Sequence, residues 1–260
     1  MGSLKNLMIL HLRDNRIADL PDSIGKLSHL AVLDLHHNLL KCLPDSIGQL
    51  SNLTTLDLHD NLLATLPTTI GSLASLKELS VYENRLTDLP ESIGNLRALV
   101  ELLINHNRLK TLPRSFCKLI HLNTLNLSAN QLLSFPPGIS ACANLRKLYL
   151  SNNKLTEFPE GITELNELVF LTLNNNQLHS IPDDIGKMQS LGMIHLQDNQ
   201  ISTLPEGIVD LPSIFMLNVK NNPISELSDT LKGWIEAVRS KQLHKSIRVL
   251  LSEGFDIDMI

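Results

Sequence analysis

Two histidines in the first quarter of the chain have the spacing and the neighbours of metal ligands. His36 and His59 lie 23 residues apart, and each follows an aspartate, Asp34 or Asp57, by two residues. Imidazole nitrogens and carboxylate oxygens together are typical ligands of zinc. No residues that would orient these ligands are evident from the sequence. We therefore favour a polar recognition surface, or plain solvation, over a metal site, and we predict neither a metal nor another cofactor.

Catalytic machinery is equally hard to find. Serines, histidines and aspartates are plentiful, but no combination of them comes with a nucleophile turn or an oxyanion pocket. The sequence contains no phosphate-binding loop and no dinucleotide fingerprint. We predict that the chain is not an enzyme.

The elements that position these side chains follow from a repeat of 23 residues. An asparagine recurs at that interval, and leucine or a close substitute holds the positions eight, five and three residues before it and two after it. This phrase matches the leucine-rich repeat pattern L-x-x-L-x-L-x-x-N-x-L. Each copy predicts one short strand, centred on Leu56 in the third copy, followed by a turn whose backbone groups the asparagine amide satisfies. We assign this structural role to Asn15, Asn38, Asn61, Asn84, Asn107, Asn130, Asn153, Asn176, Asn199 and Asn222.

The return limb is as regular as the strand. Proline follows a buried apolar residue in nine copies, and Ile or Phe comes three residues later. Proline fixes φ and donates no hydrogen bond, which favours an extended segment with at most one helical or 3₁₀ turn. The sequence therefore predicts the α/β class: a curved leucine-rich repeat solenoid with a parallel β-sheet on its concave face, short 3₁₀ or helical turns on its convex face, and a helical cap at the carboxyl end.

The repeat changes character after its tenth asparagine. Ser228 replaces the limb proline, and the apolar residues that follow have helical spacing: Leu231, Trp234, Ile235 and Val238. We predict a solenoid over 1–227 and a cap with a tail over 228–260. Within the cap we expect an amphipathic helix over 229–241, with Ser228 or Asp229 as its N-cap, and a second helix over roughly 244–252.

The concave face carries the side chains that the scaffold leaves free to vary. Adjacent strands lie about 4.8 Å apart, so ten strands span roughly 43 Å. The first half of this face is rich in His, Asp and Glu, and the second half carries aromatic and long apolar side chains, which are typical of interface centres. We predict that a protein partner contacts His36, His59, Tyr82, Glu101, Leu103, Tyr149, Phe170, Met193 and Met216.

Composition narrows the partner class and the compartment. The net charge is -5, without the basic stripe that nucleic-acid binding requires. No apolar run is long enough to span a membrane. The three cysteines, Cys42, Cys117 and Cys142, show no disulfide pattern, and no signal peptide opens the chain. We therefore expect a reducing compartment and a cytoplasmic protein.

One stretch of limb and strand, LPDSIGKLSHLAVLDLHHNLLKCLPDSIGQL, resembles the 23-residue repeats of the Ras-associated leucine-rich repeat scaffolds. The repeats of the plant intracellular Ras-group-related proteins and of Scribble, Erbin and densin are similar. The resemblance covers residues 2–227 and implies an intracellular adaptor whose partner is a small GTPase, a phosphatase subunit or a polarity protein. It transfers no contact residue, because the concave positions vary between members.

Two functions fit these observations. The first is an intracellular interaction scaffold in signalling that binds a protein partner on its concave face. The alternative is a substrate-selecting or autoinhibitory repeat segment of a larger multidomain signalling enzyme. The amino terminus keeps this alternative open, because the chain enters its first copy in the middle of a repeat. That entry indicates either a fragment of a longer protein or a natural short product.

Overall fold

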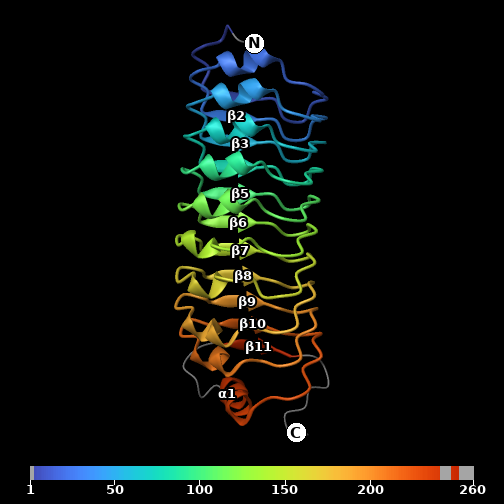
Figure 1. Ribbon diagram of the computed structural model, residues 1–260, viewed down its shortest axis with the longest axis vertical. Coiled ribbons are helices and arrows are strands. Elements are labelled where there is room, and N and C mark those ends of the chain that lie inside the picture. The colour runs from blue at the N-terminus through green and yellow to red at the C-terminus, as the bar shows by residue number, and fades with distance from the viewer. Residues whose placement is uncertain (1–2, 241–246, 252–260) are drawn as a thin grey trace.

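The repeats stack into one continuous parallel sheet. The computed structural model describes residues 3–240 and 247–251. Within them an 11-stranded sheet runs in sequence order from β1 to β11, and Figure 1 shows the repeats following one another along the long axis of the molecule. Each repeat supplies one strand of three residues: β1 (Ile9–His11), β2 (Val32–Asp34), β3 (Thr55–Asp57), β4 (Glu78–Ser80), β5 (Glu101–Leu103), β6 (Thr124–Asn126), β7 (Lys147–Tyr149), β8 (Phe170–Thr172), β9 (Met193–His195) and β10 (Met216–Asn218).

The register of the sheet is a shift of one whole repeat. Leu33 pairs with Leu56, and Leu56 pairs with Leu79, so that equivalent residues stand above one another. These central leucines are buried, whereas the residues on either side of them point to the opposite face. A strand this short has only one central side chain to bury, and stacking on its neighbours makes the core continuous.

The recurring asparagines bind the turns together as predicted. The buried side chain of Asn61 donates from Nδ2 to Leu58 O at 3.1 Å and to Leu35 O of the preceding repeat at 3.0 Å. Its Oδ1 accepts from the N–H of Leu40, also in the preceding repeat, at 2.9 Å. One amide therefore satisfies backbone groups of two repeats that no strand neighbour reaches.

The residue before each asparagine has a left-handed backbone. In the third repeat this residue is Asp60, with φ of 51°. The left-handed region is tolerated best by Asn, Asp and His among residues with a side chain. Most copies obey that preference, and Glu83 and Ala129 depart from it: Asp14, His37, Asp60, Glu83, His106, Ala129, Asn152, Asn175, Asp198 and Asn221.

The convex limb holds single 3₁₀ turns, as the prolines predict. Their bounds are η1 (Asp22–Lys26), η2 (Asp45–Gln49), η3 (Thr68–Ser72), η4 (Glu91–Asn95), η5 (Arg114–Lys118), η6 (Ile139–Ala141), η7 (Ile162–Glu164), η8 (Asp183–Lys187) and η9 (Glu206–Asp210). Glycine allows neighbouring turns to approach closely: a Cβ on Gly48 would lie 2.5 Å from Thr69 O in the next turn. The turns η6 and η7 are shorter, and each follows a left-handed glycine, Gly138 or Gly161.

A helix closes the carboxyl end of the core. Helix α1 (Asp229–Arg239) begins after Ser228, whose Oγ accepts from Leu231 N at 3.3 Å and so acts as the N-cap. Leu231 and Ile235 are buried, and Trp234 packs half-buried against the same core. The prediction of an amphipathic cap helix is confirmed. Among the described residues, no helix has the length and apolar character needed to cross a bilayer.

The prediction of a second helix over 244–252 is wrong where the structure describes that segment. Arg248–Leu250 forms strand β11, which pairs in parallel with β10. Arg248 N donates to Phe215 O at 2.9 Å, and Val219 N donates to Leu250 O at 2.9 Å. The open edge of β10 supplies backbone partners that outweigh the helical spacing of the apolar residues. The rest of that segment and the tail from 254 to 260 lie outside the described residues.

Candidate functional site

The nine predicted contact residues occupy three equivalent positions of the repeat. Four of them open a strand: Glu101, Phe170, Met193 and Met216. Two close a strand, Leu103 and Tyr149, and three lie two residues beyond a strand, His36, His59 and Tyr82. All nine are half-buried, in contrast to the fully buried leucines at the centre of each strand. The strands bring them to one side of the sheet but divide them between its two halves. We keep the name concave face for this surface.

In the first half of the concave face, three rings stack on consecutive repeats. The rings of His36 and His59 lie 4.3 Å apart, centroid to centroid, with 13° between their planes. The rings of His59 and Tyr82 also lie 4.3 Å apart, at 10°. The repeat spacing therefore builds a ladder of three nearly parallel rings. His37 adds an edge-on ring at 5.4 Å from His36.

Carboxylates hold the imidazoles of this ladder in place. His36 Nδ1 lies 2.6 Å from Asp34 Oδ1, and His59 Nδ1 lies 2.7 Å from Asp57 Oδ1. Asp57 also reaches back to the other ring, with Oδ2 at 3.7 Å from His36 Nδ1. The Asp–x–His spacing in the sequence thus becomes a direct contact in each repeat, and Asp57 lies between two imidazoles.

The environment of this cluster shifts two pKa values. Burial acts to raise the pKa of Asp34, but hydrogen bonds from His11 and from the backbone and side chain of His36 outweigh it, and the pKa is lowered. Burial raises the pKa of Tyr82, and the carboxylates of Asp57 and Glu83 raise it further. Asp34 is therefore an anion at neutral pH, and the Tyr82 hydroxyl keeps its proton.

Charge is divided unevenly between the two halves of the concave face. Over β1 to β5 and the turns that follow them, Arg13 is outnumbered by Asp14, Asp34, Asp57, Asp60, Glu78, Glu83 and Glu101. Over β6 to β10 the same positions hold Asp198 against Lys147 and Lys220. The first half is thus strongly negative while its histidines are neutral, and the second half is close to balanced.

The second half offers apolar and aromatic surface. Phe170 and Phe215 meet edge to face, with centroids 6.5 Å apart and 77° between the rings. Met193 stands between Phe170 and Met216 in the register of the sheet. Burial lowers the pKa of His195 at the end of β9, so this imidazole is neutral at pH 7.

Phe215 is a surface feature that the list of nine contact residues omits. Its side chain is 40% exposed, and its ring lies over Gly192, where an added Cβ would collide with it. The signal was present in the sequence, because glycine and phenylalanine occupy the same position in consecutive repeats, just before β9 and β10. A small residue beside a large one makes room for the ring.

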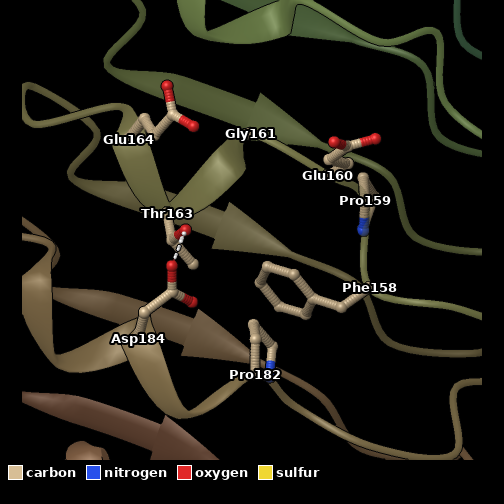
Figure 2. Close-up of a pocket in the computed structure, with 8 residues that line it drawn as sticks. All are labelled: Phe158, Pro159, Glu160, Gly161, Thr163, Glu164, Pro182 and Asp184. Atoms are coloured by element: carbon tan, nitrogen blue, oxygen red, sulfur yellow. Dashed lines mark hydrogen bonds between the residues drawn. The ribbon is translucent and has the colours of Figure 1, made fainter.

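A separate cleft of about 310 Å³ opens between the limbs that carry η7 and η8. Figure 2 shows the Phe158 ring facing Pro182, with Thr163 Oγ1 donating to Asp184 Oδ2 at 2.9 Å. The glutamates Glu160 and Glu164 point away from this contact (Figure 2). The cleft arises where the short turn η7 meets the longer η8, and it holds carboxylates without a basic group or an imidazole.

Comparison with protein families settles the class of the repeat. A model described as leucine-rich repeat region matches residues 1–85, and a model described as leucine rich repeat matches 74–132, 120–178 and 166–224. The chain belongs to the leucine-rich repeat family. No curated protein matches it.

Solved structures share the fold of this leucine-rich repeat chain over most of its length. The protein LIC12759 of Leptospira interrogans is 31% identical, with a TM-score of 0.62; the match covers 97% of this chain and 74% of that one. The ectodomain of the membrane receptor kinase GASSHO1/SCHENGEN3 of Arabidopsis thaliana, in complex with CASPARIAN STRIP INTEGRITY FACTOR 2, is 29% identical, with a TM-score of 0.80. The plant peptide hormone receptor RGFR1, in complex with RGF2, is 25% identical, with a TM-score of 0.77.

The two receptors are much longer than this chain. Each match covers 97% of this chain, but only 31% of the first receptor chain and 48% of the second. Both are leucine-rich repeat folds determined with a bound partner, and the family is generally a protein-binding fold. A role in protein interaction therefore agrees with the fold. The narrower resemblance to Ras-associated and Scribble-like scaffolds is not confirmed by the family models or by these structures.

Proposed function

We propose that this leucine-rich repeat chain is a non-enzymatic scaffold that binds a protein or peptide partner on its concave face. The observation that carries the proposal is the contrast between fixed and free positions. The core leucines and the turn asparagines meet the needs of the fold, while the concave residues differ from repeat to repeat and stay half-buried. Residues whose type is not fixed by the fold, and which lie together on one surface, are available for recognition.

The two halves of the face define the chemistry of the partner. Over β8 to β10, the partner buries the apolar side chains of Phe170, Met193 and Met216, which supplies most of the affinity. Over β2 to β5, it presents positive or hydrogen-bonding groups to the carboxylates and to the ring ladder that ends in Tyr82. This arrangement fits a partner that carries an apolar segment and a basic segment. The two segments would be as far apart as the two halves of the concave face.

We place this interaction in the cytoplasm and in signalling, with a small GTPase or a phosphatase subunit as the partner class. The free cysteines and the resemblance of the limb phrase to intracellular Ras-associated scaffolds support this assignment. The alternative, a recognition segment of a larger signalling enzyme, draws support from the receptor kinase ectodomain, of which this chain matches 31%.

Affinity capture with matched variants tests the proposal. The concave variant carries Tyr82→Ala, Tyr149→Ala and Phe170→Ala. The control variant removes three exposed apolar side chains that lie outside the strands and the 3₁₀ turns: Leu39→Ala, Ile120→Ala and Leu133→Ala. We expect the intact chain and the control to capture the same protein, and the concave variant to lose it. Equal capture by all three chains would place the binding surface elsewhere.

A further inference from the structure

A compact set of nitrogen and oxygen donors lies on two adjacent repeats of the concave face. His36, Asp57 and His59 each offer one ligand atom, and these atoms all lie within 4.8 Å of one another. We propose that the three side chains form a binding site for a divalent transition metal ion, with zinc as the preferred ion. This proposal stands apart from the choice of protein partner.

The distances within the set suit a small tetrahedral ion. Bonds of about 2.0–2.1 Å to nitrogen and oxygen place neighbouring ligand atoms of a tetrahedral site roughly 3.3 Å apart. In the structure, Asp57 Oδ1 lies 2.7 Å from His59 Nδ1, and Asp57 Oδ2 lies 3.7 Å from His36 Nδ1. These two separations lie on either side of the required value. Both Nδ1 atoms therefore lie within 4 Å of the Asp57 carboxylate, on rings that are stacked 4.3 Å apart.

A second carboxylate competes with the ion for His36. Asp34, beside His36, has a side chain only 10% exposed and contacts His36 Nδ1 at 2.6 Å. Asp34 contacts the same nitrogen that would bind the ion, so this contact must open on binding, and Asp34 is not part of the set of ligand atoms that lie within 4.8 Å of one another. An ion bound at Nδ1 leaves the ring proton of each imidazole on Nε2.

The donor types select the ion. Two imidazoles with one or two carboxylates suit zinc and its transition-metal neighbours, whereas calcium and magnesium prefer oxygen ligands alone. The side chains of His36, Asp57 and His59 are 16%, 28% and 14% exposed. The side chains are therefore sheltered but still reach solvent, so a water molecule or a group from a partner can act as a further ligand.

Another histidine–aspartate pair provides an internal comparison. His37 Nδ1 contacts Asp60 Oδ2, but the His37 side chain is 50% exposed and is not part of the donor set. If these pairs serve only to balance charge, the pair at His37 and the set around Asp57 should respond alike to metal. If the set around Asp57 is a metal site, substitutions in that set should weaken zinc binding and substitution of His37 should not.

Calorimetric titration of the full, chelator-treated chain with zinc chloride tests the inference. We expect one ion per chain, with affinity reduced more than about tenfold in His36→Gln and in His59→Gln, and unchanged in His37→Gln. Cobalt(II) titration should give the visible absorption of a tetrahedral site in the intact chain and in His37→Gln alone. Circular dichroism confirms that each variant is folded. Absence of zinc binding, or equal loss in His37→Gln, would overturn the proposal.

Discussion

Three side chains of the sixth repeat separate the roles of core, turn and concave face. Leu125 is fully buried at the centre of β6, Asn130 is the buried turn asparagine, and Asn126 lies half-buried on the concave face. Truncation of each to alanine removes a side chain of similar size from the same repeat. The free energy of unfolding should therefore report what each position does for the fold.

The structure sets the expected size of each effect. Leu125→Ala empties part of a close-packed core and should cost about 2–5 kcal/mol. Asn130→Ala leaves the buried N–H of Leu109 and the carbonyls of Ile104 and Leu127 without the amide that lies 3.0 Å from each. One unsatisfied buried group costs about 1–3 kcal/mol, and carbonyls are the more tolerant partners, so we expect about 2–4 kcal/mol in all.

The concave asparagine should matter least. Asn126 Oδ1 accepts one hydrogen bond, from Ser128 N at 3.0 Å, and water replaces it when the side chain is removed. The expected cost of Asn126→Ala is below about 1 kcal/mol. Asn130→Asp serves as a control for volume, because it keeps the shape of the turn asparagine but loses its donor and buries a charge. It should be at least as destabilising as Asn130→Ala at neutral pH.

Urea unfolding followed by circular dichroism measures these differences, provided that the slope of the transition is the same in all variants. A common slope shows that the repeats still unfold as one unit. If Asn130→Ala unfolds at the same urea concentration as Asn126→Ala, the hydrogen-bonded asparagines do not hold the repeats together. If Asn126→Ala costs as much as Leu125→Ala, the assignment of inward and outward positions is wrong.

Three further substitutions test the convex turns, the cap and the buried thiol. Gly48→Ala should destabilise the chain by about 1–3 kcal/mol in thermal unfolding, because the new Cβ would meet Thr69 O at 2.5 Å; Gly233→Ala, with nothing within 4 Å, should instead stabilise it by about 0.5–1 kcal/mol. Ser228→Ala should cost about 1 kcal/mol through loss of the N-cap, with Ser228→Asn retaining most of the stability. Burial raises the pKa of the Cys142 thiol to about 11, and the nearby thiol of Cys117 makes a smaller contribution in the same direction. The unfolded thiol therefore ionises first, and the free energy of unfolding should fall as pH rises from 9 to 11. Cys142→Ala should lack that part of the decline in pH-dependent urea titrations, and an unchanged decline would show that other groups cause it.

Periodic features of the fold could be predicted from the sequence because each has a single physical cause. A leucine such as Leu56 recurs because only an apolar side chain fits the core, and Asn61 recurs because only an amide both donates to and accepts from the turn backbone. The left-handed residue before each asparagine left a weaker signal. Aspartate, as at Asp60, favours this conformation, but alanine, as at Ala129, does not. The residue type therefore varies between repeats and does not predict the left-handed backbone.

Features that depend on contact between distant segments were beyond the sequence. Strand β11 forms because the edge of β10 is open, whereas the local spacing of Ile247 and Leu250 favours a helix. The candidate site was predicted as a set of residues on one face, and the structure places them there. The stacking of His36 on His59, and the position of Asp57 between them, depends on ring orientation, which no spacing rule determines.

The proposed metal site lies on the same concave face as the proposed partner-binding surface, so metal binding and partner binding should influence each other. Without a metal ion, the carboxylates around Asp57 give the first half of the concave face a negative field that attracts a basic segment. A zinc ion held by His36, Asp57 and His59 would add two positive charges at that point and weaken such attraction. It would not alter the apolar contacts over Phe170 and Met193, more than four strands away. Zinc should therefore reduce binding of a partner that depends on the first half and leave unchanged one that depends on the second.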